Sequence, residues 1–295
     1  MRVVVLGASG LIGRRVSAAL EARGDDVVRV TRGGTGAAVA WPGPPEPFPG
    51  DALRGADAVI NLSGAPIAGR RWTEGYKAKL RRSRVELTDA VAQALPSDWQ
   101  GALLNGSAVG YYGDRDEELD EASPPGDDYL AHLCVDWEAA ARRAEPPAAR
   151  VVLLRSGLVL ADEGPLLPRL ATFARSMLGG SLGDGRQWFP WIHIDDEVAL
   201  VLWALDRAEV RGPMNLTAPG VVRQREFAAE LRAVVGRSVG LPAPSLGLRL
   251  GLGEAADALL AGQRPAPRVA LDGGYEFRFP ILEPALRDLL SDSAA

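Results

Sequence analysis

Apolar positions along the first two-thirds of the chain form short continuous runs that alternate with longer stretches of helical spacing. Such runs are typical of parallel strands buried on both faces, and the stretches between them are typical of crossover helices. The pattern predicts strands at residues 2–6, 27–31, 37–41, 58–62, 102–106, 151–154 and 214–216, and helices at 11–23, 73–95, 129–144, 165–177 and 195–207. We therefore expect an α/β protein with a Rossmann-type, doubly wound parallel sheet.

Beyond residue 240 the pattern changes to proline-punctuated helical segments, at 246–260 and 283–290, without a sheet of their own. This change divides the chain into a Rossmann domain, residues 1–238, and a small, mainly helical C-terminal module, residues 239–295, expected on the substrate side. Within the first domain, residues 42–50 carry too many prolines to enter a sheet, and the acidic residues 114–121 predict a solvated loop. Asp195 is expected to cap the helix at 195–207.

Composition narrows the classes of partner. The 295 residues carry a formal net charge of −5 and no basic cluster, which argues against binding to nucleic acid. Cys134 is the only cysteine, and the two histidines have no ligand spacing around them, so neither a disulfide nor a metal site is expected. No apolar stretch is long enough to span a membrane, and the N-terminus resembles a core strand rather than a signal peptide. We expect a cytoplasmic protein with a small-molecule substrate, and the sequence indicates no oligomeric state.

A glycine motif opens the chain. The first apolar run leads directly into Gly7-Ala-Ser-Gly10-Leu-Ile-Gly13, and a helical pattern follows at once. Gly7 permits a tight turn, Gly10 allows the backbone to approach phosphates, and Gly13 allows close packing of the helix on the strand. The order of strand, turn and helix start therefore predicts a dinucleotide whose phosphates lie at the helix N-terminus. The alternative is a glycine-rich turn in another α/β fold.

The residues at the end of the second predicted strand indicate which dinucleotide the protein binds. A protein that binds NAD usually has an acid there, which accepts a hydrogen bond from the ribose 2′-hydroxyl. Here the strand ends on Thr31 and Arg32. Arg32 can bind a 2′-phosphate and Thr31 can add a hydroxyl, so we expect NADP(H) in preference to NAD(H). The alternative for Arg32 is an ordinary solvated side chain.

Several further stretches carry a resemblance to a known family. They are residues 61–67, 71–73, 107–113, 137–138, 155–160, 191–193 and 218–219, with Lys77, Ser83, Arg84, Thr88 and Asn215. Together with the glycine motif they resemble the extended short-chain dehydrogenase/reductases, and most closely the atypical NAD-dependent epimerase/dehydratase subgroup called epimerase family protein 39U, whose C-terminal module has no known function. The resemblance implies that the following residues line the cofactor: Gly7, Ser9, Gly10, Leu11, Ile12, Gly13, Leu62, Ser63, Gly64, Ser107, Arg155 and Gly157.

The same resemblance exposes a gap in the catalytic machinery. Alcohol-oxidising members of the superfamily use Tyr-x-x-x-Lys on a helix, with Ser or Thr on the preceding strand. Here Leu130 takes the place of the tyrosine, Cys134 that of the lysine and Ala108 that of the serine, with Ser107 one position upstream. The identity of the general acid or base is therefore open. For each remaining candidate the alternative is an ordinary structural role. They are Tyr129 sharing a proton with His132, Tyr111 or Tyr112 in a loop, and His193, with Ser107 as a further catalytic candidate.

The glycine-rich residues 179–191 are the expected substrate wall. Gln187 and Trp191 would contact the substrate there, and Trp72 and Tyr111 would face the same cleft. The alternative is a lid with core tryptophans. Two functions remain open from the sequence. One is an NADP(H)-dependent oxidoreductase or epimerase-like enzyme, and the other is a catalytically silent NADP(H)-binding regulatory or sensor protein.

Overall fold

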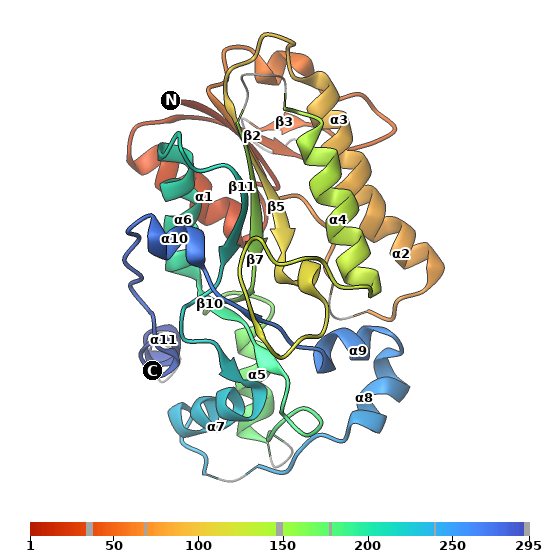
Figure 1. Ribbon diagram of the computed structural model, residues 1–295, viewed down its shortest axis with the longest axis vertical. Helices are drawn as coiled ribbons and strands as arrows, with labels where there is room; N and C mark the ends of the chain where they lie inside the picture. Colours follow the sequence, from red (N-terminus) through yellow and green to blue (C-terminus); the bar gives the residue numbers. More distant parts are fainter. Residues whose placement is uncertain (34–37, 68–69, 146–149, 177–178, 239, 292–295) are drawn as a thin grey trace.

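A central parallel sheet organises the computed structural model, which describes residues 1–33, 38–67, 70–145, 150–176, 179–238 and 240–291. Its strands are β1 (Arg2–Leu6), β2 (Asp26–Thr31), β3 (Val39–Ala40), β4 (Ala58–Asn61), β5 (Ala102–Ala108), β7 (Arg150–Ser156) and β11 (Gly212–Leu216). Within the described residues they lie in the order β11-β7-β5-β4-β1-β2-β3, and every neighbouring pair is parallel (Figure 1). This is the doubly wound Rossmann order that the sequence predicts. It reverses between β1 and β4, where such sheets bind ligands.

Helices cover both faces of the sheet. One face carries α1 (Leu11–Ala22), α6 (Ile194–Asp206) and α10 (Arg268–Asp272), and the other carries α3 (Leu87–Ala94), α4 (Tyr129–Arg142) and the 3₁₀ turn η1 (Gly50–Leu53). Successive residues of β1 alternate between the two cores, Val3 and Val5 toward α1 and Val4 and Leu6 toward α3. Burial on both faces explains why the strands appear in the sequence as continuous apolar runs.

The helix predicted at 73–95 is formed, with one irregular turn. It consists of α2 (Glu74–Arg81), a π-helical turn η2 (Arg82–Glu86) and α3. Thr73 caps α2, since its side chain accepts a hydrogen bond from the N–H of Tyr76. A π-helical turn changes which side chains face the sheet, and such turns are frequent at functional sites.

A second lobe lies beyond the carboxyl ends of the strands (Figure 1). It contains β8 (Leu158–Leu160), α5 (Leu167–Arg175), β9 (Trp188–Phe189), β10 (Trp191–His193), β12 (Val222–Arg223), α7 (Gln224–Val234) and α11 (Leu282–Leu290). The sequence pattern did not predict α7. Its N-cap position holds Arg223, which is no capping signal, although the Glu226 carboxylate accepts from the Arg223 N–H at 2.7 Å. The expected cap of α6 is also corrected: His193, not Asp195, holds that position, and its Nδ1 accepts from the Asp195 N–H.

The C-terminal module has no core of its own within the described residues. Its elements are α8 (Ser245–Leu252), α9 (Ala255–Leu260), β13 (Arg264–Pro265), α10 and α11. Ala255, Ala270 and Leu286 pack into three different clusters that the first domain also forms. The module thus lies across the domain as a strap. It also contributes β13, which pairs with β6 (Glu118–Leu119) where the sequence predicted no strand.

The acidic residues 114–121 hold this strap in place. Leu119 and Glu121 are buried, and the Glu121 carboxylate accepts from the backbone N–H groups of Asn215 and Val269 at 3.1 and 3.2 Å. The prediction of a solvated loop holds for Asp114, Asp116, Glu117, Glu118 and Asp120, which are exposed, and is wrong for Leu119 and Glu121. The charge pattern gave no sign that an acid in this stretch would accept hydrogen bonds from two distant segments.

Glu197 is expected to make the stability of the fold depend on pH. Its side chain is fully buried in the first turn of α6, where the Ser156 hydroxyl donates to Oε1 at 2.6 Å. Desolvation raises the pKa of Glu197 from 4.5 to about 8. A carboxyl whose pKa is raised by folding contributes stability below its unfolded pKa, and this contribution is lost as pH rises through the folded value.

Replacing Glu197 by Gln should flatten this dependence. Between pH 6 and 8 the wild type should lose roughly 2 kcal/mol more unfolding free energy than Glu197→Gln, because only the acid must ionise in a buried site. Urea unfolding at both pH values measures the difference. Glu209→Gln, at an exposed pair with Arg207, is the control and should behave as the wild type. Parallel curves for the wild type and Glu197→Gln would contradict the prediction.

Candidate functional site

The glycine turn after β1 has the geometry that its sequence predicts. Gly7 adopts φ +74°, and a Cβ there would lie 2.8 Å from the carbonyl carbon of Leu62 in the loop after β4. A Cβ on Gly13 would collide with the Gly7 carbonyl oxygen. Both glycines are therefore required by close backbone approach.

The start of α1 is suited to an anion. Gly10 is the N-cap residue, its N–H donates to the Gly7 carbonyl at 2.9 Å, and no side chain caps the helix. Ser9 and Gly10 are exposed, so the helix N-terminus opens to solvent at the point where the strand order reverses. An uncapped helix end with its partial positive charge fits a dinucleotide diphosphate.

The structure brings most of the expected cofactor residues to this one edge. The turn at Gly7–Gly13 lies against Leu62 and Ser63, and Gly64 follows in the same loop. Thr31 and Arg32 stand at the end of the adjacent strand β2, with Arg32 exposed. Contacts to a cofactor stay a prediction for all of these residues.

Arg155 and Ser107 form a buried polar network with Glu138. Its side chain is almost completely buried, and its guanidinium donates to both carboxylate oxygens of Glu138, at 2.8 and 2.9 Å. The Ser107 hydroxyl donates to the same carboxylate at 2.7 Å. Both side chains thus make their polar contacts within the protein, and contact of Arg155 or Ser107 with a cofactor stays a prediction. Gly157 is required by packing, because a Cβ there would collide with the Pro190 carbonyl.

Tyr112 extends this buried network to the C-terminal strap. Its hydroxyl accepts from Arg155 Nη1 at 3.0 Å and donates to the Asn215 side-chain oxygen at 2.7 Å. The Asn215 amide in turn donates to the Ala266 carbonyl at 2.9 Å. Desolvation raises the pKa of Tyr112 to about 12, although Arg155 opposes the shift. Tyr112 is therefore a neutral structural link.

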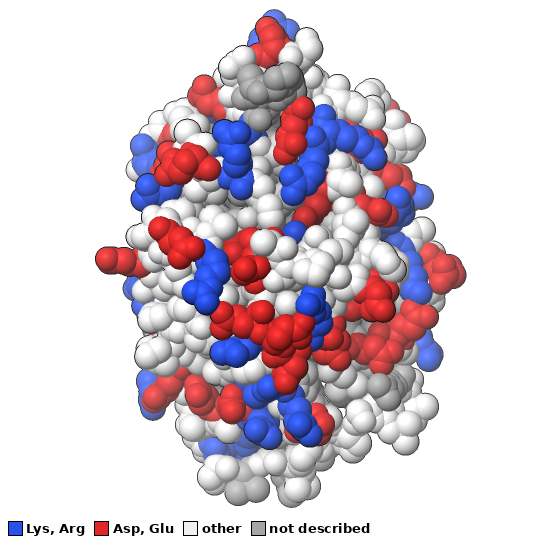
Figure 2. All heavy atoms as spheres, viewed as in Figure 1, with Lys and Arg blue, Asp and Glu red and all other residues white. Residues whose placement is uncertain are grey.

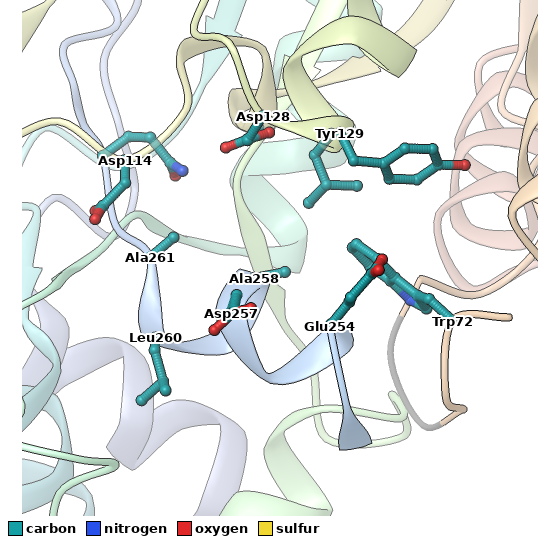
Figure 3. A pocket seen from close by; sticks show the side chains of 12 residues that line it. Trp72, Asp114, Asp128, Tyr129, Glu254, Asp257, Ala258, Leu260 and Ala261 are labelled. Carbon is teal, nitrogen blue, oxygen red and sulfur yellow. The ribbon is translucent and has the colours of Figure 1, made fainter. Parts of the chain in front are cut away.

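A cavity of about 420 Å³ lies past the carboxyl end of β5, between the start of α4 and α9 (Figure 3). Its lining joins segments that are far apart in the sequence. The residues are Trp72, Gly110, Asp114, Asp128, Tyr129, Leu130, Glu254, Asp257, Ala258, Leu260, Ala261 and Gln263. A volume of this size accommodates a small molecule, and the position is the one at which open α/β sheets bind ligands.

The two positions that replace the usual catalytic pair are chemically inert. Leu130 lines the cavity and lies beside Gly110. Cys134, one turn further along α4, is buried, and desolvation raises the pKa of its thiol to about 12, with the Glu138 charge adding to the shift. Neither side chain exchanges a proton near neutral pH.

Tyr129 forms part of the cavity wall, but its hydroxyl points away from the cavity (Figure 3). The hydroxyl donates to the Lys77 carbonyl at 3.2 Å, and the ring lies 5.4 Å from that of Trp72. Desolvation raises its pKa. His132 is exposed on the same helix. The catalytic role of Tyr129 stays a prediction, and the geometry gives it no direct support.

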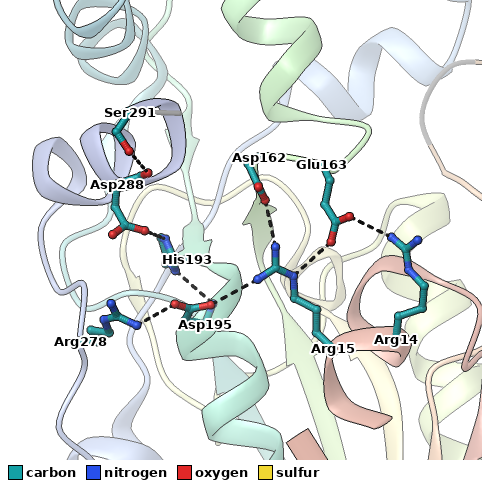
Figure 4. Close-up of polar contacts among 9 residues, drawn as sticks. All are labelled: Arg14, Arg15, Asp162, Glu163, His193, Asp195, Arg278, Asp288 and Ser291. Carbon is teal, nitrogen blue, oxygen red and sulfur yellow. Dashed lines mark hydrogen bonds and ion pairs between the residues drawn. The ribbon is translucent and has the colours of Figure 1, made fainter. Parts of the chain in front are cut away.

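His193 lies in a different environment (Figure 4). It is buried against the ring of Phe279 at 3.9 Å, its Nδ1 caps α6, and its Nε2 lies 3.3 Å from Asp288 of α11. Burial lowers its pKa. Neither His193 nor Ser107 lines the cavity, so the structure does not bring the three expected catalytic residues together.

Of the four residues expected to contact the substrate, only Trp72 is among the residues that line the cavity. Trp191 is completely buried, with its indole N–H on the Gly220 carbonyl, so it has no surface for a substrate and belongs to the core. Gln187 donates to the Leu182 carbonyl, and Tyr111 stacks on Arg155 beside a separate hollow.

Arg84 is a candidate site residue that the sequence indicates only through the family resemblance. It lies in the π-helical turn, donates to the Ala65 carbonyl at 3.0 Å, and would lie 3.0 Å from a Cβ on Gly64. Its guanidinium packs 5.2 Å from the Trp137 ring centroid, and desolvation lowers its pKa. No described carboxylate forms an ion pair with it. A partly buried cation therefore faces the loop after β4, and no described residue supplies its counter-ion.

The comparisons with known proteins agree with this geometry. The profile of the NAD dependent epimerase/dehydratase family matches residues 3–216. The chain belongs to this family. Residues 243–289 match a second profile, DUF1731, a domain of unknown function. Among the residues that the structure describes, no helix is long and apolar enough to cross a membrane, and no group of His, Cys, Asp and Glu side chains forms a metal site.

Individual relatives cover nearly the whole chain. Epimerase family protein Mb2239 of Mycobacterium bovis is 40% identical, over 96% of each chain. The crystal structure of human epimerase family protein SDR39U1, isoform 2, with NADPH is 35% identical and has a TM-score of 0.90, covering 99% of this chain and 100% of the human one. A nucleoside-diphosphate sugar epimerase from Corynebacterium glutamicum is 33% identical, with a TM-score of 0.81, and covers 98% of this chain and 58% of that one.

The buried pair of Arg155 and Glu138 can be tested directly. Arg155→Met should cost about 3–5 kcal/mol of unfolding free energy, because it leaves the Glu138 carboxylate buried without a counter-ion. Adding Glu138→Gln to this variant should restore part of the loss, since it removes the unpaired charge. Urea unfolding of the single and double variants measures both effects. A single-variant cost below about 1 kcal/mol would show that the pair behaves as a surface ion pair.

Proposed function

We propose that this protein binds NADP(H) and acts as an oxidoreductase or epimerase-like enzyme on a small molecule held in the cavity beneath α9. One observation carries the proposal: the uncapped glycine turn and the cavity lie at the same carboxyl edge of the parallel sheet. The NADPH in the human SDR39U1 structure supports the choice of cofactor, because that relative matches this chain over its full length.

Each part of the cofactor would meet a suitable group. The diphosphate fits the N-terminus of α1, and the exposed Arg32 at the end of β2 fits a 2′-phosphate. Arg84 adds a cation behind Gly64 and Ala65. The bound nicotinamide would supply hydride exchange at the site, and the protein would supply binding and orientation.

The preference for NADP(H) depends on Arg32 in this proposal. The wild type should bind NADPH at least tenfold more tightly than NADH, and Arg32→Ala should remove most of this difference, because the 2′-phosphate loses its charged partner. Isothermal titration calorimetry gives both dissociation constants. Equal affinities in the wild type, or an unchanged preference in Arg32→Ala, would refute the assignment.

Arg84 should matter for cofactor affinity as well. A guanidinium without a counter-ion favours a ligand that brings negative charge or acceptor oxygens, so Arg84→Met should weaken NADPH binding roughly tenfold. Arg82→Met is the matched control, because Arg82 lies two residues away and is exposed, 3.8 Å from Glu86. Thermal melts verify that both variants fold. Equal affinity in the two variants would show that Arg84 only supports the loop.

A second function, a cofactor-binding sensor without turnover, is favoured by the inert pair Leu130 and Cys134. A screen of carbonyl compounds, imines and nucleotide sugars for NADPH consumption or epimerised product separates the two functions. Turnover of any compound supports the enzyme. NADPH binding without turnover across the screen supports the sensor.

A further inference from the structure

The C-terminal strap exposes an apolar helix, α8, near the lower end of the molecule (Figure 1). Leu246 and Leu250 are 69% and 72% exposed, and their spacing of four places them on one face of the helix. Leu241, shortly before the helix, is 55% exposed. The only polar residues of α8 are Ser245 and Arg249, whereas a surface helix normally presents a polar stripe to water.

These leucines differ from the other exposed apolar side chains. Six large apolar side chains are exposed among the described residues, and three of them lie within residues 241–250. The others, Met1, Leu271 and Ile281, lie in separate segments. Single exposed apolar side chains are ordinary, but three in one short segment indicate an interaction surface.

Arginines flank the start of this segment. Residues 180–183 and 241–243 form backbone hydrogen bonds with each other, so the two stretches lie side by side. Arg175 and Arg186, on either side of the first stretch, and Arg237, just before the second, are all exposed. None of these three arginines forms an ion pair with a described carboxylate, so their charges are available to a partner.

A further arginine lies at the other end of α8. Arg71 is exposed, and its Nε would lie 2.8 Å from a Cβ on Gly253, the residue that follows the helix. Arg71 likewise forms no ion pair with a described carboxylate. Positive charge therefore flanks both ends of the apolar helix.

Negative charge is sparse in these segments. In residues 175–186 and 237–254 the only acids are Asp184 and Glu254, and Glu254 pairs with Lys77. Figure 2 shows the surface over α8 as white, at the lower right, with blue side chains beside it. The face is thus apolar with a positive rim, in a chain whose net charge is −5.

We propose that α8 and its flanking arginines dock on the surface of a lipid bilayer that carries anionic headgroups. Leu241, Leu246 and Leu250 would enter the boundary between headgroups and acyl chains, and the arginines would lie at the level of the lipid phosphates. The face lies outside the glycine turn and the residues assigned to the cofactor, so this inference does not rest on the proposed function.

The charge of the rim favours this occupant over two others. A second copy of the chain would bring the same positive rim against this one, and like charges repel. A peptide partner would need a groove, and neither described cavity is lined by residues of α8. A bilayer surface needs no groove, and it offers negative charge and an apolar layer together.

Flotation of the full-length protein with lipid vesicles tests the proposal. At about 20 mM salt, vesicles of equal parts phosphatidylcholine and phosphatidylglycerol should bind the protein roughly tenfold more tightly than vesicles of phosphatidylcholine alone. Raising the salt to about 500 mM should remove most of this preference, because salt screens the arginines from the headgroups. Absence of binding to the anionic vesicles at low salt, or equal binding to both kinds of vesicle, overturns the proposal.

A leucine variant places the apolar contact on α8. Leu246→Ser combined with Leu250→Ser should weaken binding to the anionic vesicles roughly tenfold, because both side chains lose their apolar contact. Ile281→Ser, at a side chain that is 63% exposed outside this face, is the matched control and should bind as the wild type. Thermal melts verify that both variants fold. Unchanged vesicle binding in the leucine variant overturns the proposal.

An arginine variant tests the rim. Arg175→Gln combined with Arg237→Gln should reduce the preference for anionic vesicles to less than threefold. Arg54→Gln combined with Arg143→Gln removes the same charge at exposed ion pairs outside this face, and should leave the preference unchanged. Equal losses in the two double variants would show that only the net charge matters, which overturns the site.

Two further measurements test the other occupants. In sedimentation equilibrium without lipid, the wild type and the leucine variant should have the same mass. A dimer that the leucine variant dissociates would show that a second copy covers α8, and this result overturns the proposal. Binding of poly-glutamate as tight as binding of the anionic vesicles, and equal in the leucine variant, would assign the arginines to an acidic protein instead.

Discussion

The buried ion pair between Arg155 and Glu138 connects the sheet to α4 and, through Tyr112 and Asn215, to the C-terminal strap. Two charges in the interior cost desolvation free energy, which is offset here by bidentate geometry and by the hydrogen bonds from Ser107 and to Tyr112. Tyr112 and Asn215 carry the network from β7 to the C-terminal strap. The position of α9 over the cavity therefore depends on the buried charges of Arg155 and Glu138, which do not line the cavity themselves.

The sequence predicts what depends on local geometry. The turn at Gly7–Gly13 is specified by backbone space and positive φ, and the sheet by continuous apolar runs, so both are present as predicted. The strap is different, because its position depends on partners 148 residues apart, such as Gly262 with Asp114 and Val269 with Glu121. Residue type alone could not show that an acid in a charged stretch would be buried.

The candidate catalytic residues show a related limit. A histidine and a tyrosine have suitable chemistry wherever they occur, but their role depends on where the polar atoms point. The ring nitrogen Nδ1 of His193 caps a helix, and the hydroxyl of Tyr129 lies on a carbonyl outside the cavity. Trp191 is similar, since the same residue in a glycine-rich segment can line a pocket or complete a core, and here it completes the core.

The π-helical turn connects the cofactor proposal to the way the chain folds. Arg84 lies in this turn, is partly buried, and donates to the Ala65 carbonyl behind the loop after β4. No described carboxylate forms an ion pair with it, and desolvation lowers its pKa. Placing a cation there costs desolvation free energy, and an anionic dinucleotide bound against the same loop would offset part of that cost. The turn that interrupts the helix after β4 would therefore serve the ligand rather than the stability of the empty protein.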